Sequence, residues 1–149
     1  MHTKDAGTVG ELAVALQLKR AGYSVFIELG DNSPIDLIVI SEDKLLRGQV
    51  KSCKLVDGSA CLALRKAGPR GYLRKYIDDR NMLDFFALYV HDTEQIAYIS
   101  AQEAFASCPG STRLTFRASP ARNKQKSGIR HFENYADFGR ILQAVRESA

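Results

Sequence analysis

The feature that most constrains this fold is an apolar run followed by a tight turn and a second β-rich run. Residues 35–40 carry a single charge, at Asp36, and Glu42-Asp43-Lys44 is of turn type. Residues 45–52 then alternate in the way of a half-buried strand. The pattern predicts an antiparallel β-hairpin. Because 149 residues suit one ordinary domain, we expect the hairpin to belong to a single domain over residues 1–149.

A helix is predicted before the hairpin, from Thr8 to Ala21. Thr8-x-x-Glu11 has the spacing of a capping box, and Gly22 is of the residue type that ends a helix. A strand over residues 23–29 and a turn over residues 30–34 then lead into the hairpin.

More strands and helices are predicted after the hairpin. Ser100-x-x-Glu103 opens a short helix that ends near Pro109, and Asn134 caps a last helix. Residues 119–130 are polar and basic, as in a loop. Further strands are expected at residues 61–64, 85–90, 95–99 and 114–117. This order predicts an α/β domain with a central mixed sheet flanked by helices.

The composition is that of a globular protein, with 45% hydrophobic and 26% charged residues. No apolar run approaches the roughly 20 residues of a membrane helix, and the first residues do not resemble a signal peptide. We therefore expect a cytoplasmic protein. The three cysteines, Cys53, Cys61 and Cys108, form no C-x-x-C motif. A disulfide framework or a zinc knuckle is thus disfavoured, and inert thiols are expected.

The charge is segregated along the chain, although the net charge is only +4. Residues 44–77 contain nine basic and one acidic side chain, and residues 104–131 contain six basic and no acidic ones. The other segments are mainly acidic. Two basic segments of this kind favour a polyanionic partner, with nucleic acid expected, over two basic faces that serve solubility alone.

The candidate DNA contacts are the basic residues of these two segments and one near the N-terminus. Lysines mostly contact phosphates, whereas arginines also read guanine edges. Aromatic residues do not interleave with them at base-stacking spacing, so duplex DNA is favoured over single strands. The candidates are Lys4, Arg65, Lys66, Arg70, Arg74, Lys75, Arg113, Arg117, Arg122, Lys124, Lys126 and Arg130.

The hairpin also carries the residues most suited to chemistry. A lone carboxylate in an apolar strand, such as Asp36, is costly unless it is paired or binds a cation. Strand periodicity places Gln49 and Lys51 on one face of the next strand, while Val50 and Leu46 serve the core. A carboxylate, an amide oxygen and an ammonium would then converge, and such hard oxygen ligands suit Mg²⁺. The alternatives are a solvated Asp36 at the strand end and an ordinary edge strand with a solvated polar face.

Glu11 is a further candidate for the same site. It lies at i, i+4 and i+7 spacing with Ala15 and Leu18, so it heads an apolar stripe and can point along the sheet. The alternative is that Glu11 only completes the capping box with Thr8. The three histidines, His2, His91 and His131, lack the spacing of metal ligands and are expected to be incidental.

Pro34-Ile35-Asp36, followed thirteen residues after the aspartate by Gln49-Val50-Lys51, resembles the signature of PD-(D/E)XK nucleases. Gly10-Glu11 resembles the helix glutamate of the same superfamily, and this core resemblance covers residues 7–52. The chain departs from the signature at Gln49, which stands where a second acidic residue is expected. This replacement removes one negative charge from the metal site.

The combination of Glu11, Asp36, Gln49 and Lys51 in a chain of this size closely resembles bacterial group I intron-encoded homing endonucleases. Asp84-Phe85-Phe86 and the basic stretch at residues 119–130 are similar to that group as well. The resemblance implies a restriction-endonuclease-like fold and a Mg²⁺-dependent enzyme, with Mn²⁺ able to substitute. It also implies cleavage of both strands of a long DNA target by a homotetramer.

The expected mechanism is in-line attack of water on a phosphodiester. Asp36, Gln49, the Val50 carbonyl and Glu11 would hold the metal, which lowers the pKa of water. Lys51 would orient the attacking water or stabilise developing charge. Because two strands must be cut, symmetric self-association is expected, through the last helix or the strand at residues 85–90.

Other functions share these residues. A Holliday-junction resolvase would choose DNA by shape instead of sequence. A DNA-binding protein whose centre is weakened by Gln49 would bind without cutting. A protein that uses the basic segments for RNA is a further alternative.

Overall fold

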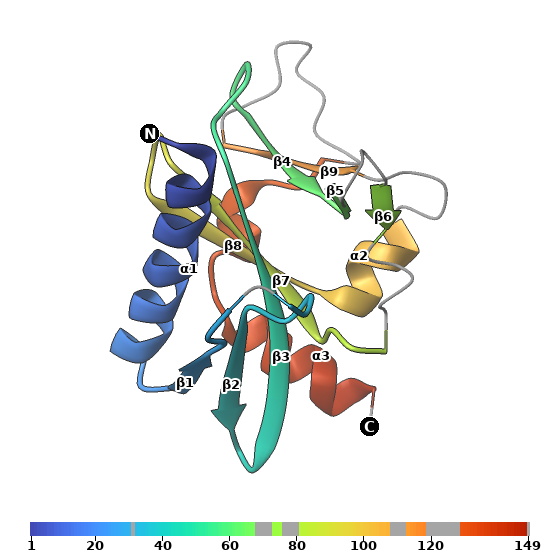
Figure 1. Ribbon diagram of the computed structural model, residues 1–149. Helices are drawn as coiled ribbons and strands as arrows, with labels where there is room; N and C mark the ends of the chain where they lie inside the picture. The colour runs from blue at the N-terminus through green and yellow to red at the C-terminus, as the bar shows by residue number, and fades with distance from the viewer. Residues whose placement is uncertain (31, 68–72, 76–80, 108–112, 119–128, 149) are drawn as a thin grey trace.

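The computed structural model describes residues 1–30, 32–67, 73–75, 81–107, 113–118 and 129–148 (Figure 1). Its centre is a five-stranded sheet in the order β1-β2-β3-β7-β8. Only the β3–β7 pair is parallel, and the other neighbours are antiparallel. The strands are β1 (Ser24–Ile27), β2 (Leu37–Ser41), β3 (Lys44–Cys53), β7 (Phe85–Val90) and β8 (Gln95–Ser100). The predicted mixed sheet is confirmed.

Helices and one of two small sheets, the β4–β9 pair, pack on this central sheet (Figure 1). The small sheets pair β4 with β9 and β5 with β6, both antiparallel. The remaining elements are α1 (Thr3–Arg20), β4 (Ser59–Ala63), β5 (Arg65–Ala67), β6 (Leu73–Lys75), α2 (Ala101–Ser107), β9 (Arg113–Arg117), the 3₁₀ turn η3 (Phe132–Tyr135) and α3 (Gly139–Glu147). No helix in the described part of the chain is both long and apolar enough to cross a membrane.

Two hydrophobic cores lie on opposite faces of the sheet. Along β7, Phe85, Ala87 and Tyr89 belong to the core shared with α1 and α3. The alternate residues of β7 belong to the core beneath β4, β9 and α2. All six residues of β7 are buried, and the strand lies inside the sheet between β3 and β8. The expectation that residues 85–90 supply an interface between subunits is therefore wrong.

The predicted hairpin is confirmed, with its strands at Leu37–Ser41 and Lys44–Cys53 in place of residues 35–40 and 45–52. Ser41 pairs with Lys44 across a two-residue turn, and both turn residues, Glu42 and Asp43, have positive φ angles of 53° and 63°. Such left-handed residues give the turn the twist of the flanking strands.

The first helix begins at Thr3, earlier than the predicted start at Thr8. Thr8 makes no capping box, because its hydroxyl donates to the carbonyl of Lys4 within the helix at 3.1 Å. The His2 side chain caps the helix instead, by accepting from Lys4 N. The C-terminal stop is confirmed: Gly22 has a φ of 95°, and its N–H donates to the carbonyl of Lys19.

The last helix begins at Gly139, and Asn134 does not cap it. Asp137 Oδ1 accepts from Gly139 N at 2.8 Å, beside the first turn of α3. Tyr135 packs against Phe116 in one core, whereas Phe138 belongs to the core on the other face of the sheet. One continuous helix cannot serve both faces, so the chain breaks between these two aromatic residues.

Candidate functional site

The predicted site residues meet at the point where the pairing between β2 and β3 ends. Leu37, the first residue of β2, pairs with Gly48, so β3 has no partner from β2 beyond this point. Asp36 crosses the gap: its Oδ2 accepts from Val50 N at 2.7 Å and from Gln49 Nε2 at 2.5 Å. The carboxylate is thus paired by hydrogen bonds. Such pairing offsets the cost of a lone charge in an apolar strand.

Gln49 is held between two oxygens. Its side-chain nitrogen donates to Asp36 Oδ2 and also to the carbonyl oxygen of Val50, at 3.2 Å. The residue is only 6% exposed, so this amide is not the solvated polar group of an ordinary edge strand. A carboxylate and a carbonyl oxygen are hard ligands of the type that Mg²⁺ takes, and here the amide N–H groups satisfy both.

One cavity of about 470 Å³ brings the four predicted catalytic residues together. Glu11, Asp36, Gln49 and Lys51 all line it. The described residues contain no group of three His, Cys, Asp or Glu side chains placed to hold a metal. A cation here would therefore use the two carboxylates together with neutral amide, carbonyl and water oxygens. This donor set fits Mg²⁺, which is usually held by one or two carboxylates and several waters.

A close helix–strand contact places Glu11 at this cavity. A Cβ atom at the preceding residue, Gly10, would lie 3.1 Å from Ser52 Cβ. The absence of a side chain at Gly10 therefore lets α1 approach β3 closely. Ser52 also donates to the carbonyl of Ala6 at 3.4 Å. Glu11 lies beside the buried stripe of α1, which contains Gly10, Val14 and Leu18.

Arg47 and Asp84 bond to each other at the edge of β3 that faces β7. Arg47 N donates to Asp84 Oδ2 at 2.7 Å, and the guanidinium forms an ion pair with the same carboxylate at 3.0 Å. The hydrogen bond from Arg47 to Asp84 raises the pKa of the guanidinium. Asp84 N in turn donates to the carbonyl of Arg47. This reciprocal contact sets the start of β7 against β3, directly before Gly48 and Gln49.

His91 is a residue that sequence reasoning missed. It was expected to be incidental, but it lines the same cavity, together with Lys54. Its backbone N–H donates to the carbonyl of Cys53, and its ring packs edge-on against Tyr89 at 5.0 Å. His91 Nε2 is buried and has no hydrogen-bond partner among the described residues. Only the β3–β7 register brings His91 level with the end of β3, and the sequence carries no local signal for that parallel pairing.

The thiol beside this cavity is not set up as a nucleophile. Burial raises the pKa of the Cys53 thiol, so the group remains protonated at neutral pH. Cys53 and Cys61 are free and half-buried, and Cys108 lies outside the described residues.

The predicted DNA contacts are described only in part. Lys66 pairs with Arg74 and Arg65 pairs with Lys75, so four basic residues occupy paired backbone positions of β5 and β6. Arg117 donates to the carbonyl of Asp57 and to Ser59 Oγ, which ties it to the fold. Lys4 and Arg113 are exposed, and Arg65 and Arg130 are half-buried. The predicted contacts outside the described residues are Arg70, Arg122, Lys124 and Lys126.

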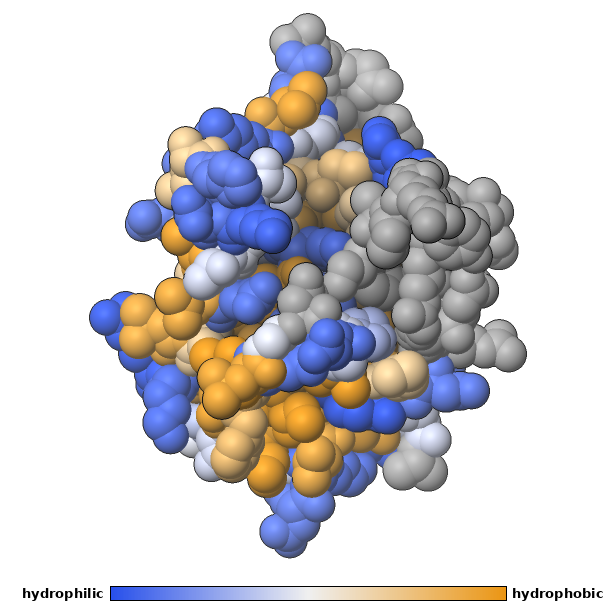
Figure 2. Space-filling view, in the orientation of Figure 1, coloured by the Kyte–Doolittle hydropathy of each residue, from blue (hydrophilic) through white to orange (hydrophobic). Residues whose placement is uncertain are grey.

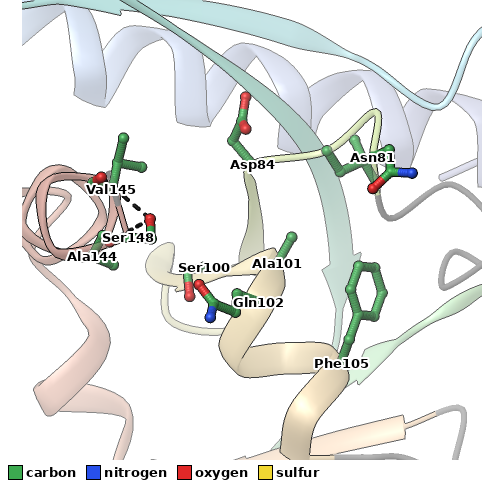
Figure 3. Close-up of a pocket in the computed structure, with 10 residues that line it drawn as sticks. Asn81, Asp84, Ser100, Ala101, Gln102, Phe105, Ala144, Val145 and Ser148 are labelled. Carbon is green, nitrogen blue, oxygen red and sulfur yellow. Dashed lines mark hydrogen bonds between the residues drawn. The ribbon is translucent and has the colours of Figure 1, made fainter.

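A separate cavity of about 360 Å³ lies between the start of β7, α2 and α3 (Figure 3). Among the described residues that line it, Asp84 is the one charged residue, and it is bonded to Arg47. None of the four predicted catalytic residues lines this cavity. The candidate site is therefore the cavity at the parting of β2 and β3.

Comparison with known proteins identifies the family and the fold. A model of the family described as PD-(D/E)XK endonuclease matches residues 1–138. The chain belongs to the PD-(D/E)XK endonuclease family. It is therefore a nuclease, and divalent metal dependence is general in this family. No curated protein matches the sequence.

Among solved structures, this endonuclease is similar to a bacterial homing endonuclease, I-Ssp6803I. The TM-score is 0.76 and the sequence identity is 20%, over 99% of this chain and 97% of that chain. At this identity the likeness shows a shared fold.

Replacing Gln49 by glutamate is expected to destabilise the metal-free endonuclease by about 1–3 kcal/mol. The introduced carboxyl group cannot donate to Asp36 or to Val50 O unless it is protonated, so the fold raises its pKa. A carboxyl group whose pKa is higher in the folded than in the unfolded state stabilises the folded protein at low pH. This stabilisation is lost as the pH rises through the folded-state pKa. We therefore expect the melting temperature to fall more at mildly alkaline than at mildly acidic pH.

Thermal unfolding with and without Mg²⁺ measures this effect. Added Mg²⁺ should restore more stability to Gln49→Glu than to the native protein, because the variant offers an extra anionic ligand. Gln102→Glu makes the same chemical change at an exposed position and is the matched control. Equal melting temperatures for Gln49→Glu and native protein at every pH would show that the amide bridge is energetically unimportant.

Proposed function

We propose that this protein is a Mg²⁺-dependent, site-specific endonuclease that cuts both strands of duplex DNA, of the intron-homing type. Glu11, Asp36, Gln49 and Lys51 form its catalytic centre. The observation that carries the proposal is that these four side chains line one cavity, with Asp36 bonded directly to Gln49 and Val50. A bacterial homing endonuclease of the same fold supports the choice within the family.

The roles of the residues follow from their chemistry. Asp36, Gln49 Oε1, the Val50 carbonyl and Glu11 would hold the metal. A bound Mg²⁺ polarises a phosphoryl oxygen and makes water more acidic, and Mn²⁺ is expected to substitute. For Gln49 to act as a ligand its amide must turn, because its nitrogen now faces Asp36 and Val50. Lys51 orients the attacking water and balances the negative charge that develops on the phosphate.

The two basic segments supply affinity for DNA. Lysine and arginine contacts to phosphates release counterions, so binding should weaken steeply with added salt. One chain carries one centre, whereas a duplex has two strands to cut. The active form is therefore at least a dimer, and we propose a homotetramer that acts on DNA in the cytoplasm.

Cleavage of genomic DNA tests the proposal. We expect discrete fragments with Mg²⁺, and no fragments with EDTA or with the Lys51→Ala variant. A smear would contradict site specificity. Cleavage that survives both EDTA and Lys51→Ala would contradict the proposed centre, and cutting of four-way junctions alone would favour a Holliday-junction resolvase.

One observation favours a second function, a DNA-binding protein with a weakened centre. Gln49 lacks the charge of a second carboxylate, and its N–H groups bond to two of the oxygens expected to bind the metal. Tight, salt-sensitive binding of DNA with no cleavage in Mg²⁺ or Mn²⁺ would favour this function.

A further inference from the structure

The outer strand β1 has an open edge. It pairs with β2, and no strand among the described residues pairs with its other side. Arg47 directs its N–H and C=O to Asp84, away from β2, so its cross-strand partner Ile38 bonds toward β1. Because bonded pairs alternate in an antiparallel ladder, Phe26 bonds to Ile38, and Val25 and Ile27 turn their N–H and C=O groups outward.

This edge lacks the features that usually prevent strand addition. The strand reads Ser24-Val25-Phe26-Ile27, without a charge or a proline. Phe26 is 56% exposed on one face of the sheet, and Ile27 is 45% exposed on the other. An edge that is uncharged and apolar on both faces is suited to pairing with another strand.

More exposed apolar side chains surround the edge. On the face of Phe26 they continue across the hairpin to Ile40 and Leu45, which pair with each other. Figure 2 shows hydrophobic side chains gathered over the β1–β2–β3 part of the sheet. On the opposite side, α1 packs on β1 and exposes Leu12 and Leu16. A surface of this composition does not suit DNA phosphates.

We propose that two copies of this chain pair through β1, antiparallel to β1 of the second copy, so that their five-stranded sheets join into one continuous sheet. An uncharged strand is complementary to itself under the two-fold symmetry of an antiparallel pair. The inference rests on the proposed function in one respect: cutting two strands requires two centres, and each chain has one.

The pairing also sets how the two centres are related in space. The two-fold axis of an antiparallel pair is perpendicular to the sheet, so the same face of both copies lies on the same side. Asp36 directly precedes β2, the neighbour of β1. Three strand spacings of about 4.8 Å then separate the two Asp36 positions by about 14 Å in the direction across the strands, and their offset along the strands adds to this distance. Both centres therefore belong to one continuous sheet.

Two variants test the pairing without touching the catalytic centre. Ile27→Pro removes an outward N–H that does not serve the ladder with β2, where proline is tolerated. Phe26→Lys places a charge on the apolar face of the edge. Val56→Lys is the matched control, because Val56 is also apolar and 71% exposed but lies outside the sheet edge.

Light scattering after gel filtration measures the mass of each protein, and thermal unfolding shows that each is folded. We expect the native chain and Val56→Lys to share one multimeric mass, and both edge variants to have at most half of it. A monomeric native protein, or two folded edge variants of native mass, would overturn the pairing.

Amide exchange gives a readout that does not depend on a variant. The N–H groups of Val25 and Ile27 should exchange more slowly as the concentration of native protein rises, because dimerisation protects them. Exchange at these positions that is independent of concentration while the mass changes would place the interface elsewhere.

Cleavage separates this inference from the proposed function. On a supercoiled plasmid that carries a mapped target, the edge variants should nick one strand but lose the linear product. Efficient linear product from a monomeric edge variant would contradict the pairing. A native protein that pairs through β1 but never cuts DNA would contradict the proposed function alone.

Discussion

Asp36→Asn is expected to lower the rate of DNA cleavage about a thousandfold, which corresponds to about 4 kcal/mol of transition-state stabilisation. Asp36 Oδ2 lies between Val50 N and Gln49 Nε2, beside the carbonyl of Val50. Asparagine nearly matches the shape of aspartate but removes the negative charge expected to bind the metal. Because the metal stabilises charge by several kcal/mol, most of the rate should be lost while DNA affinity remains.

Single-turnover cleavage at saturating enzyme measures the loss, and Mn²⁺ binding followed by electron paramagnetic resonance identifies its cause. Asp36→Asn should lose both activity and Mn²⁺ binding, whereas Lys51→Ala should lose activity and keep Mn²⁺ binding. Asp43→Asn is the matched control, since it makes the same change in an exposed turn whose positive φ suits asparagine. Cleavage by Asp36→Asn within about tenfold of the native rate would remove Asp36 from the centre.

The hairpin and its polar residues were predictable because their signals are local. Strand alternation and a two-residue turn set the register of β2 on β3, and this register brings Asp36 to Gln49. The sequence does not reveal which groups the Gln49 amide bonds to. The bond from its nitrogen to the carbonyl of Val50 depends on the gap that opens where β2 ends.

Three features differ from the sequence-based predictions because tertiary structure decides them. The start of α3 was misplaced because Tyr135 and Phe138 serve cores on opposite faces of the sheet, although their spacing suits one helix. Residues 85–90 suit an interface on sequence alone, as does the last helix, because an apolar run does not show whether a strand is central or at an edge. His91 was dismissed because its place at the cavity depends on parallel pairing between distant segments.

Gly48→Ala is expected to destabilise the protein by about 3 kcal/mol or more, at the upper end of the effects of overpacking. A Cβ atom at position 48 would lie 2.3 Å from Phe85 Cζ, well inside van der Waals contact. The ring cannot withdraw easily, because Phe85 is fully buried and packs edge-on against Phe138 at 5.1 Å. The backbone is also confined, since Gly48 pairs with Leu37 on one side and Phe85 on the other.

Urea unfolding of Gly48→Ala measures the loss, and a second substitution identifies its cause. Phe85→Leu removes the atoms of the ring tip, so Gly48→Ala should cost clearly less in that background than alone. Gly7→Ala is the matched control: a Cβ there meets nothing within 4 Å, and alanine is favoured over glycine in a helix by about 1 kcal/mol. A Gly48→Ala protein within about 1 kcal/mol of native stability would contradict the contact with Phe85. Since Gly48 directly precedes Gln49, the same clash should displace the amide from Asp36, and the small residue thus links the packing of the sheet to the geometry of the cavity.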